Sequence, residues 1–103
     1  MNQQIFKEIQ SLKRQLLPNG KVILFGSQAR GDEREDSDWD LLVVLNKEKK
    51  EFEDEDTYGF PFDKIGWNYG AAVNTIIYST KEWEKRKITP FYKNVEKEGI
   101  EIN

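Results

Sequence analysis

The chain has 103 residues, of which 37% are hydrophobic and 34% are charged, and its formal net charge is −3 at pH 7. It contains no cysteine and no histidine, which excludes disulfide frameworks, Cys/His zinc sites and Ser-His-Asp triads. Carboxylates, hydroxyls and lysines are left to do chemistry. The small negative charge disfavours a nucleic-acid substrate, because domains that bind nucleic acids usually present a basic face.

A chain of this length can bury one modest core, so we expect a single domain spanning residues 1–103. The N-terminus has no apolar segment of the signal-peptide kind, and no apolar run is long enough to span a bilayer. We therefore expect a cytoplasmic protein that does not associate with membranes. The many aromatic residues leave homo-oligomerisation open.

The first predicted element is an amphipathic helix over residues 3–17, which Pro18-Asn19-Gly20 ends. Its apolar residues recur at helical spacing: Ile5, Ile9, Leu12 and Leu16. Residues 21–25 predict a short strand and residues 39–45 a second one. Residues 26–36 predict a turn that holds one helical turn around residues 28–31.

The polar run over residues 46–56 predicts a mobile surface loop. Residues 58–69 predict a helix that accepts Pro61 in its first turn, and Gly70 ends it. Four aromatic residues of this segment predict core packing rather than a platform for base stacking. They are Phe60, Phe62, Trp67 and Tyr69.

Residues 72–78 predict a third strand. A hydroxyl cap at Ser79-Thr80 and the pair Thr89-Pro90 then predict the starts of two further helices. The basic segment 81–87 interleaves acidic residues and indicates an exposed helix face. We expect the last helix and residues 100–102 to pack against the sheet.

The most informative motif joins the first two strands. Gly26 and Ser27 follow the first strand, and after ten further residues Asp38 and Asp40 open the second. A glycine lets the backbone approach a phosphate, and a serine hydroxyl can donate to a phosphate oxygen. Two aspartates one residue apart on a strand point to the same face and can hold Mg²⁺. The motif therefore predicts a site for a metal-bound nucleoside triphosphate.

This order of residues resembles the signature of the DNA polymerase β superfamily of nucleotidyltransferases. The local sequences over residues 26–31 and 37–42 resemble those of its minimal nucleotidyltransferase (MNT) group. The resemblance implies an α+β fold with a small mixed sheet and helices packed on one face. It also implies Mg²⁺ as the cofactor and ATP as the nucleotide, although the sequence itself gives no preference between ATP, GTP, CTP and UTP. Many members are antitoxins, and some transfer AMP to a HEPN-domain toxin, so the resemblance implies a HEPN-type protein partner.

Arg30 has two interpretations that the sequence leaves open. It can contact a phosphate, or it can pair with the acidic loop over residues 32–36. In the same loop we expect Glu33, Glu35 and Asp36 to be solvated rather than to act as further metal ligands.

Asn74 is a departure from the pattern of the family. Active members usually supply a third carboxylate from a later strand, and the apolar pattern of residues 72–78 places Asn74 at that position. An amide oxygen can ligate a cation, but it carries no charge and cannot act as a general base at neutral pH. The alternative is that Asp63 or Glu82 comes close in space instead.

The predicted site thus has Asp38 and Asp40 as catalytic residues and metal ligands. Gly26, Ser27, Arg30 and Asn74 are its predicted nucleotide-binding residues. Two functions remain open: transfer of AMP to a protein hydroxyl, or a degenerate, non-catalytic module that binds a nucleotide or masks a partner. Asn74 favours the second function, and the intact Asp38/Asp40 pair favours the first.

Overall fold

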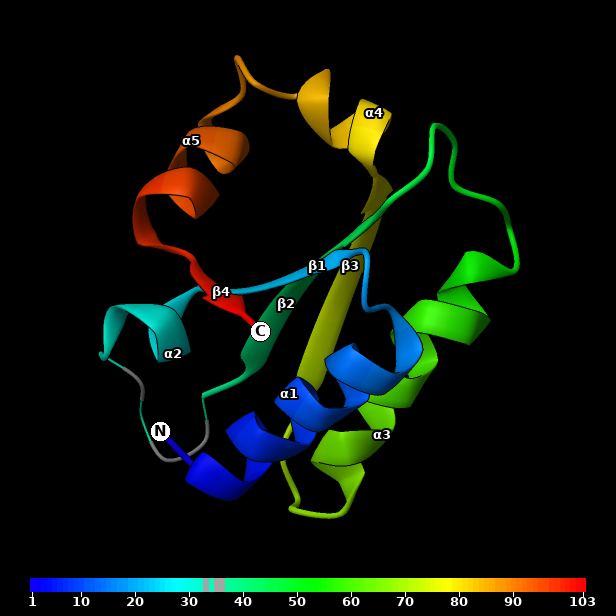
Figure 1. Cartoon of the computed structure of the whole chain (residues 1–103). Coiled ribbons are helices and arrows are strands. Elements are labelled where there is room, and N and C mark those ends of the chain that lie inside the picture. Colours follow the sequence, from blue (N-terminus) through cyan, green and yellow to red (C-terminus); the bar gives the residue numbers. More distant parts are fainter. Residues whose placement is uncertain (33, 35–36) are drawn as a thin grey trace.

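A four-stranded mixed sheet forms the centre of the molecule in the computed structural model, which describes residues 1–32, 34 and 37–103 (Figure 1). The strand order is β3-β2-β1-β4. β1 is antiparallel to both β2 and β4, whereas β3 is parallel to β2. The strands are β1 (Lys21–Phe25), β2 (Trp39–Leu45), β3 (Val73–Ser79) and β4 (Ile100–Ile102). The mixed sheet and its helices confirm the predicted α+β class.

Helices α1 (Gln3–Leu16) and α3 (Phe60–Trp67) cover one face of the sheet (Figure 1). The side chain of Asn2 caps α1 by accepting hydrogen bonds from the backbone N–H groups of Gln4 and Ile5. The predicted apolar stripe of α1 faces the core, where Ile5 and Ile9 are fully buried. This prediction is therefore confirmed.

Helices α4 (Thr80–Glu84) and α5 (Pro90–Glu98) cover the opposite face of the sheet (Figure 1). Trp83 of α4 and Val95 of α5 pack there against Leu42 and Val44 of β2. The helices are thus divided between the two faces, whereas we expected them on one. The reason is that β2 is apolar on both sides and needs cover on both.

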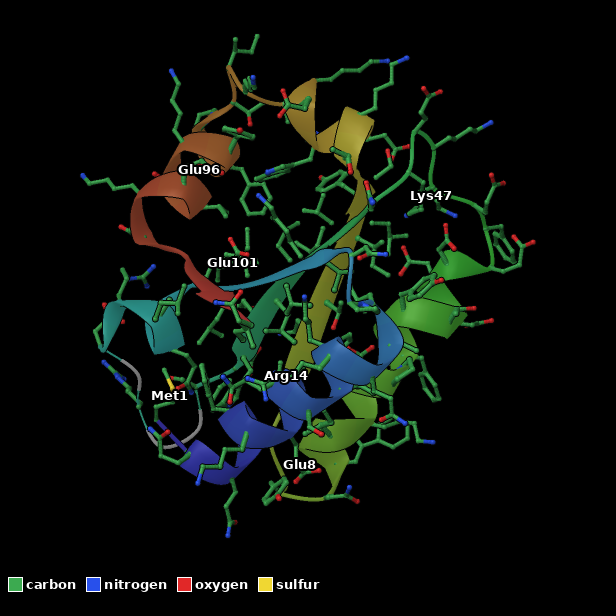
Figure 2. The ribbon with its side chains drawn as sticks, in the orientation of Figure 1. Met1, Glu8, Arg14, Lys47, Glu96 and Glu101 are labelled. Atoms are coloured by element: carbon green, nitrogen blue, oxygen red, sulfur yellow. The ribbon has the colours of Figure 1, made fainter. Side chains whose placement is uncertain are left out.

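The segment between β2 and α3 differs from the predicted loop. Within the polar run, Asp54 is buried and forms an ion pair with Lys47 at 2.6 Å, and it accepts a hydrogen bond from the backbone of Glu51 at 2.6 Å. Lys47 lies just beyond the end of β2, beside this loop (Figure 2). A π-helical turn, η1 (Glu55–Gly59), then leads into α3. The helical segment therefore starts earlier than predicted, and Pro61 lies in the first turn of α3 as expected.

The prediction that the aromatic residues of segment 58–69 pack in the core is wrong for three of the four. Phe62 is fully buried, but Phe60 is 45%, Trp67 65% and Tyr69 36% exposed. Phe60 and Trp67 are two helical turns apart, so they lie on the same, outward side of α3. Their rings contact each other edge to face, with centroids 5.4 Å apart.

No helix among the described residues is long and apolar enough to cross a membrane.

Candidate functional site

Strand pairing brings the residues of the predicted site together at one end of the strands. In the antiparallel pair of β1 and β2, Phe25 lies opposite Asp40, so Gly26 comes next to that aspartate. In the parallel pair of β2 and β3, Asp40 lies opposite Asn74. The glycine turn, the aspartate pair and Asn74 therefore meet where β1 ends and where β2 and β3 begin.

Gly26 allows the close approach between the turn and Asp40. Its backbone has φ 77° and ψ −157°, a conformation that is essentially restricted to glycine. A Cβ atom at this position would lie 2.5 Å from Oδ2 of Asp40. The sequence predicted a glycine for approach to a phosphate, and the structure adds that the carboxylate of Asp40 also needs this space.

Ser27 begins the short helix α2 (Ser27–Arg30), directly after the glycine turn. The first N–H groups of a helix have no intrahelical acceptors, so they are free to donate to a ligand. Among the described residues, none forms a hydrogen bond with Oγ of Ser27. The turn thus offers hydrogen-bond donors beside the carboxylates of β2.

The side chains of Asp38, Asp40 and Asn74 form one hydrogen-bonded group. Nδ2 of Asn74 donates to Oδ2 of Asp38 at 2.9 Å and lies 3.4 Å from Oδ1 of Asp40. Burial raises the pKa of Asp40, and the charge of Asp38 raises it further, while the hydrogen bond from Asn74 and the charge of Arg30 act in the opposite direction. The site therefore concentrates negative charge that its neighbours only partly offset.

The alternative third carboxylates lie elsewhere. Asp63 accepts a hydrogen bond from Oγ1 of Thr75 at 2.9 Å, and Thr75 points to the face of β3 opposite to that of Asn74. Glu82 accepts from the backbone N–H of Ser79 in the capping box of α4, at the far end of β3. Among the described residues, no three acidic, histidine or cysteine side chains form a cluster that could hold a metal ion. Asn74 thus occupies the position that we predicted for it.

With residues that the structure describes, Arg30 forms two ion pairs on the surface of the molecule. Its guanidinium group lies 3.2 Å from Asp32 and 3.4 Å from Glu98 of α5. The pair with Asp32 agrees with the acidic-loop interpretation, whereas Glu98 was not predicted. Glu33, Glu35 and Asp36 lie outside the described residues.

An open cavity of about 550 Å³ adjoins Asp38. Met1, at the start of the chain, lines it together with Trp39 and Ala72 (Figure 2). Gln28, the residue after Ser27, also lines this cavity and is only 5% exposed. Its Nε2 donates to the backbone oxygen of Ser37 at 3.2 Å, and its Oε1 has no hydrogen-bond partner among the described residues. No pattern in the sequence marks this residue, because its buried position involves a contact with Ser37, nine residues further along the chain.

The sequence model of the nucleotidyltransferase domain family matches residues 3–102. The chain therefore belongs to this family. Its motif and its similarity to the proteins described next identify it as a domain of the MNT type, as its sequence predicted.

Two curated relatives come from Methanocaldococcus jannaschii, and each bears the name "putative protein adenylyltransferase". One is 38% identical over 82 residues, which cover 77% of this chain and 73% of the relative. The other is 34% identical over 82 residues, which cover 80% of this chain and 77% of the relative.

A solved structure titled "Crystal structure of the toxin-antitoxin with AMP-PNP" matches with a TM-score of 0.67 and 18% sequence identity. The match covers 100% of this chain and 73% of the other. At this level of identity the similarity shows a shared fold.

Proposed function

We propose that the chain binds Mg²⁺ and a nucleoside triphosphate, ATP by preference, and transfers AMP to a hydroxyl group of a protein partner. In this proposal the chain is the antitoxin of a HEPN/MNT toxin–antitoxin pair. The observation that carries the proposal is the contact between the turn at Gly26 and the carboxylate of Asp40. It brings the turn that we propose for phosphate binding and the carboxylate that we propose for metal binding together at one point of the sheet.

The residues at this point suit Mg²⁺. The ion prefers oxygen ligands and is typically bound through one or two carboxylates together with substrate phosphates. Asp38 directly precedes β2 and Asp40 lies within it, and two residues apart they point to the same side. Asn74 donates a hydrogen bond to each of them without adding charge. When bound, Mg²⁺ supplies positive charge that offsets the negative charge of the triphosphate.

The remaining residues orient the nucleotide. The hydroxyl of Ser27 and the N–H groups at the start of α2 donate to phosphate oxygens. Arg30 is 44% exposed, and it can exchange a surface carboxylate for a phosphate, to which guanidinium groups bind strongly.

In the transfer step, the acceptor oxygen forms a bond to the α-phosphorus while the bond to the α,β-bridging oxygen breaks. Pyrophosphate leaves. Asn74 cannot accept the proton of the acceptor hydroxyl, because an amide is not a base at neutral pH. The proton therefore passes to water or to a group that the acceptor brings.

The relatives support this proposal. Two of them bear names that specify transfer of adenylyl groups to proteins, and the structure with the same fold contains a toxin–antitoxin and AMP-PNP. These are properties of those proteins, and they indicate the class of donor and acceptor to test first.

A second candidate function is a non-catalytic module that binds a nucleotide or masks its partner. The observation in its favour is that Asn74 stands where a third carboxylate is expected and donates to both aspartates. The retained Asp38/Asp40 pair favours catalysis, because a chain without chemistry has no need of two adjacent carboxylates.

Two measurements test the proposal. Calorimetric titration with ATP, with and without Mg²⁺, should show metal-dependent binding that the double variant Asp38→Asn/Asp40→Asn abolishes. Incubation with α-labelled ATP and a HEPN-domain protein encoded beside this chain should then label that protein. Binding without labelling would favour the non-catalytic module, and binding that survives in the double variant would refute the site.

A further inference from the structure

Asn74 contacts both aspartates from one side. A single nitrogen, Nδ2, lies 2.9 Å from Oδ2 of Asp38 and 3.4 Å from Oδ1 of Asp40. Ionised carboxylates only accept hydrogen bonds, so the amide must turn its NH₂ group toward them. The side of the carboxylate pair that faces β3 is therefore occupied by a hydrogen-bond donor.

The second oxygen of Asp40 has a different neighbour. Oδ2 lies beside Gly26, at 2.5 Å from the place where a Cβ atom would stand. The two oxygens of this carboxylate thus face different elements: Oδ1 faces Asn74 on β3, and Oδ2 faces the glycine turn after β1. The proposed function places the phosphates at this turn. We therefore expect a cation that bridges Asp40 and the phosphates to bind to Oδ2, the oxygen beside the turn.

The charge of the site limits how many cations it can hold. Two-metal sites place their ions about 3.5–4 Å apart, and anionic ligands must offset the repulsion between them. Here two carboxylates are present, and among the described residues no third acidic side chain joins them. To bind a cation, Asn74 would have to turn its amide oxygen inward and give up its hydrogen bonds to both aspartates.

We infer that this domain holds a single divalent cation with its nucleotide, on the side of Gly26, and that Asn74 excludes a second cation from the side of β3. The inference rests on the proposed function, because it specifies the cation stoichiometry of that same site. According to this inference, Asn74 determines how many cations the site binds.

The test counts the manganese that the protein retains for each nucleotide. The protein is equilibrated with Mn²⁺ and an ATP analogue in which CH₂ replaces the α,β-bridging oxygen, so that no transfer occurs. Protein-bound Mn²⁺ and bound nucleotide are then measured after rapid gel filtration. We expect a ratio of about one for the native chain and about two for Asn74→Asp, which supplies the third carboxylate.

A matched control adds the same charge elsewhere. Asn46 follows β2 at the end of the sheet opposite to the site, so Asn46→Asp should keep the ratio of the native chain. Circular dichroism checks that each variant is folded. If Asn74→Asp does not fold, the ratio of the native chain still decides, because one supports the inference and two overturns it.

The other outcomes are equally distinct. A ratio of one in both the native chain and Asn74→Asp would overturn the role of Asn74. A native chain that retains nucleotide with two Mn²⁺ ions would overturn the inference while leaving the proposed function intact. A native chain that retains neither nucleotide nor Mn²⁺ would overturn the proposed function and the inference with it.

Discussion

Replacing Gly26 by alanine tests the central contact of the site. The backbone of Gly26 has φ 77° and ψ −157°, where a side chain costs roughly 1–3 kcal/mol of backbone strain. The added Cβ would also lie 2.5 Å from Oδ2 of Asp40, and relieving such overpacking costs about 1–3 kcal/mol. We therefore expect Gly26→Ala to lower the free energy of unfolding by about 2–6 kcal/mol. In a domain of this size that corresponds to a fall in Tm of at least about 8 °C.

Thermal unfolding and calorimetric titration with Mg²⁺ and ATP measure the two consequences of Gly26→Ala. Binding should be lost, because the carboxylate of Asp40 has to move away from the turn. Gly70→Ala is the matched control, since Gly70 also has a positive φ of 63°, but beyond its chain neighbours no atom of the described residues lies within 4 Å of an added Cβ. It should cost roughly 1–2 kcal/mol of backbone strain and leave binding unchanged. Native stability and native binding in Gly26→Ala would refute the reasoning.

Two further predictions concern residues outside the site. Burial alone would raise the pKa of Asp54, but the hydrogen bonds from Lys47 and from the backbone of Glu51 lower it below its ordinary value of 3.8. The carboxylate thus contributes stability above that pH, and the contribution is lost as the pH falls through the lower folded-state pKa. Asp54→Asn should lower the free energy of unfolding by about 1–3 kcal/mol at pH 7 and by a smaller amount at pH 3, as measured by urea unfolding. Equal losses at both pH values would contradict this. In α3, Phe62→Ala should lower the free energy of unfolding by about 3–5 kcal/mol, and Trp67→Ala by at most about 1 kcal/mol. Similar losses for the two variants in urea unfolding would mean that Trp67 is not exposed in solution.

The sequence predicted that Asp38, Asp40 and Asn74 lie side by side, because their relative positions depend on local chain geometry. Asp38 and Asp40 share a face through the two-residue period of a strand, and the apolar pattern of β3 was enough to align Asn74 with them. The structure confirms this alignment, since Asp40 and Asn74 are register partners. Their roles in binding and catalysis stay predictions.

Features that depend on distant parts of the chain could not be predicted in the same way. Asp54 stands in a charged run that is typical of a surface loop, and its burial follows from the position of Lys47 after β2. The ion pair between Arg30 and Glu98 joins residues 68 positions apart in the sequence. Aromatic residues occur on both sides of α3. Composition alone could therefore not distinguish its buried side from its exposed side, and both were predicted to pack in the core.

The setting of Asn74 also bears on how such a site can change during evolution. The residue is exposed, lies on a strand at the edge of the sheet, and belongs to neither hydrophobic core cluster. Asparagine and aspartate have nearly the same shape, and their codons differ by a single base. One point mutation can therefore exchange the amide for a carboxylate without any repacking of the interior. Loss and recovery of the third carboxylate are equally accessible steps for this chain.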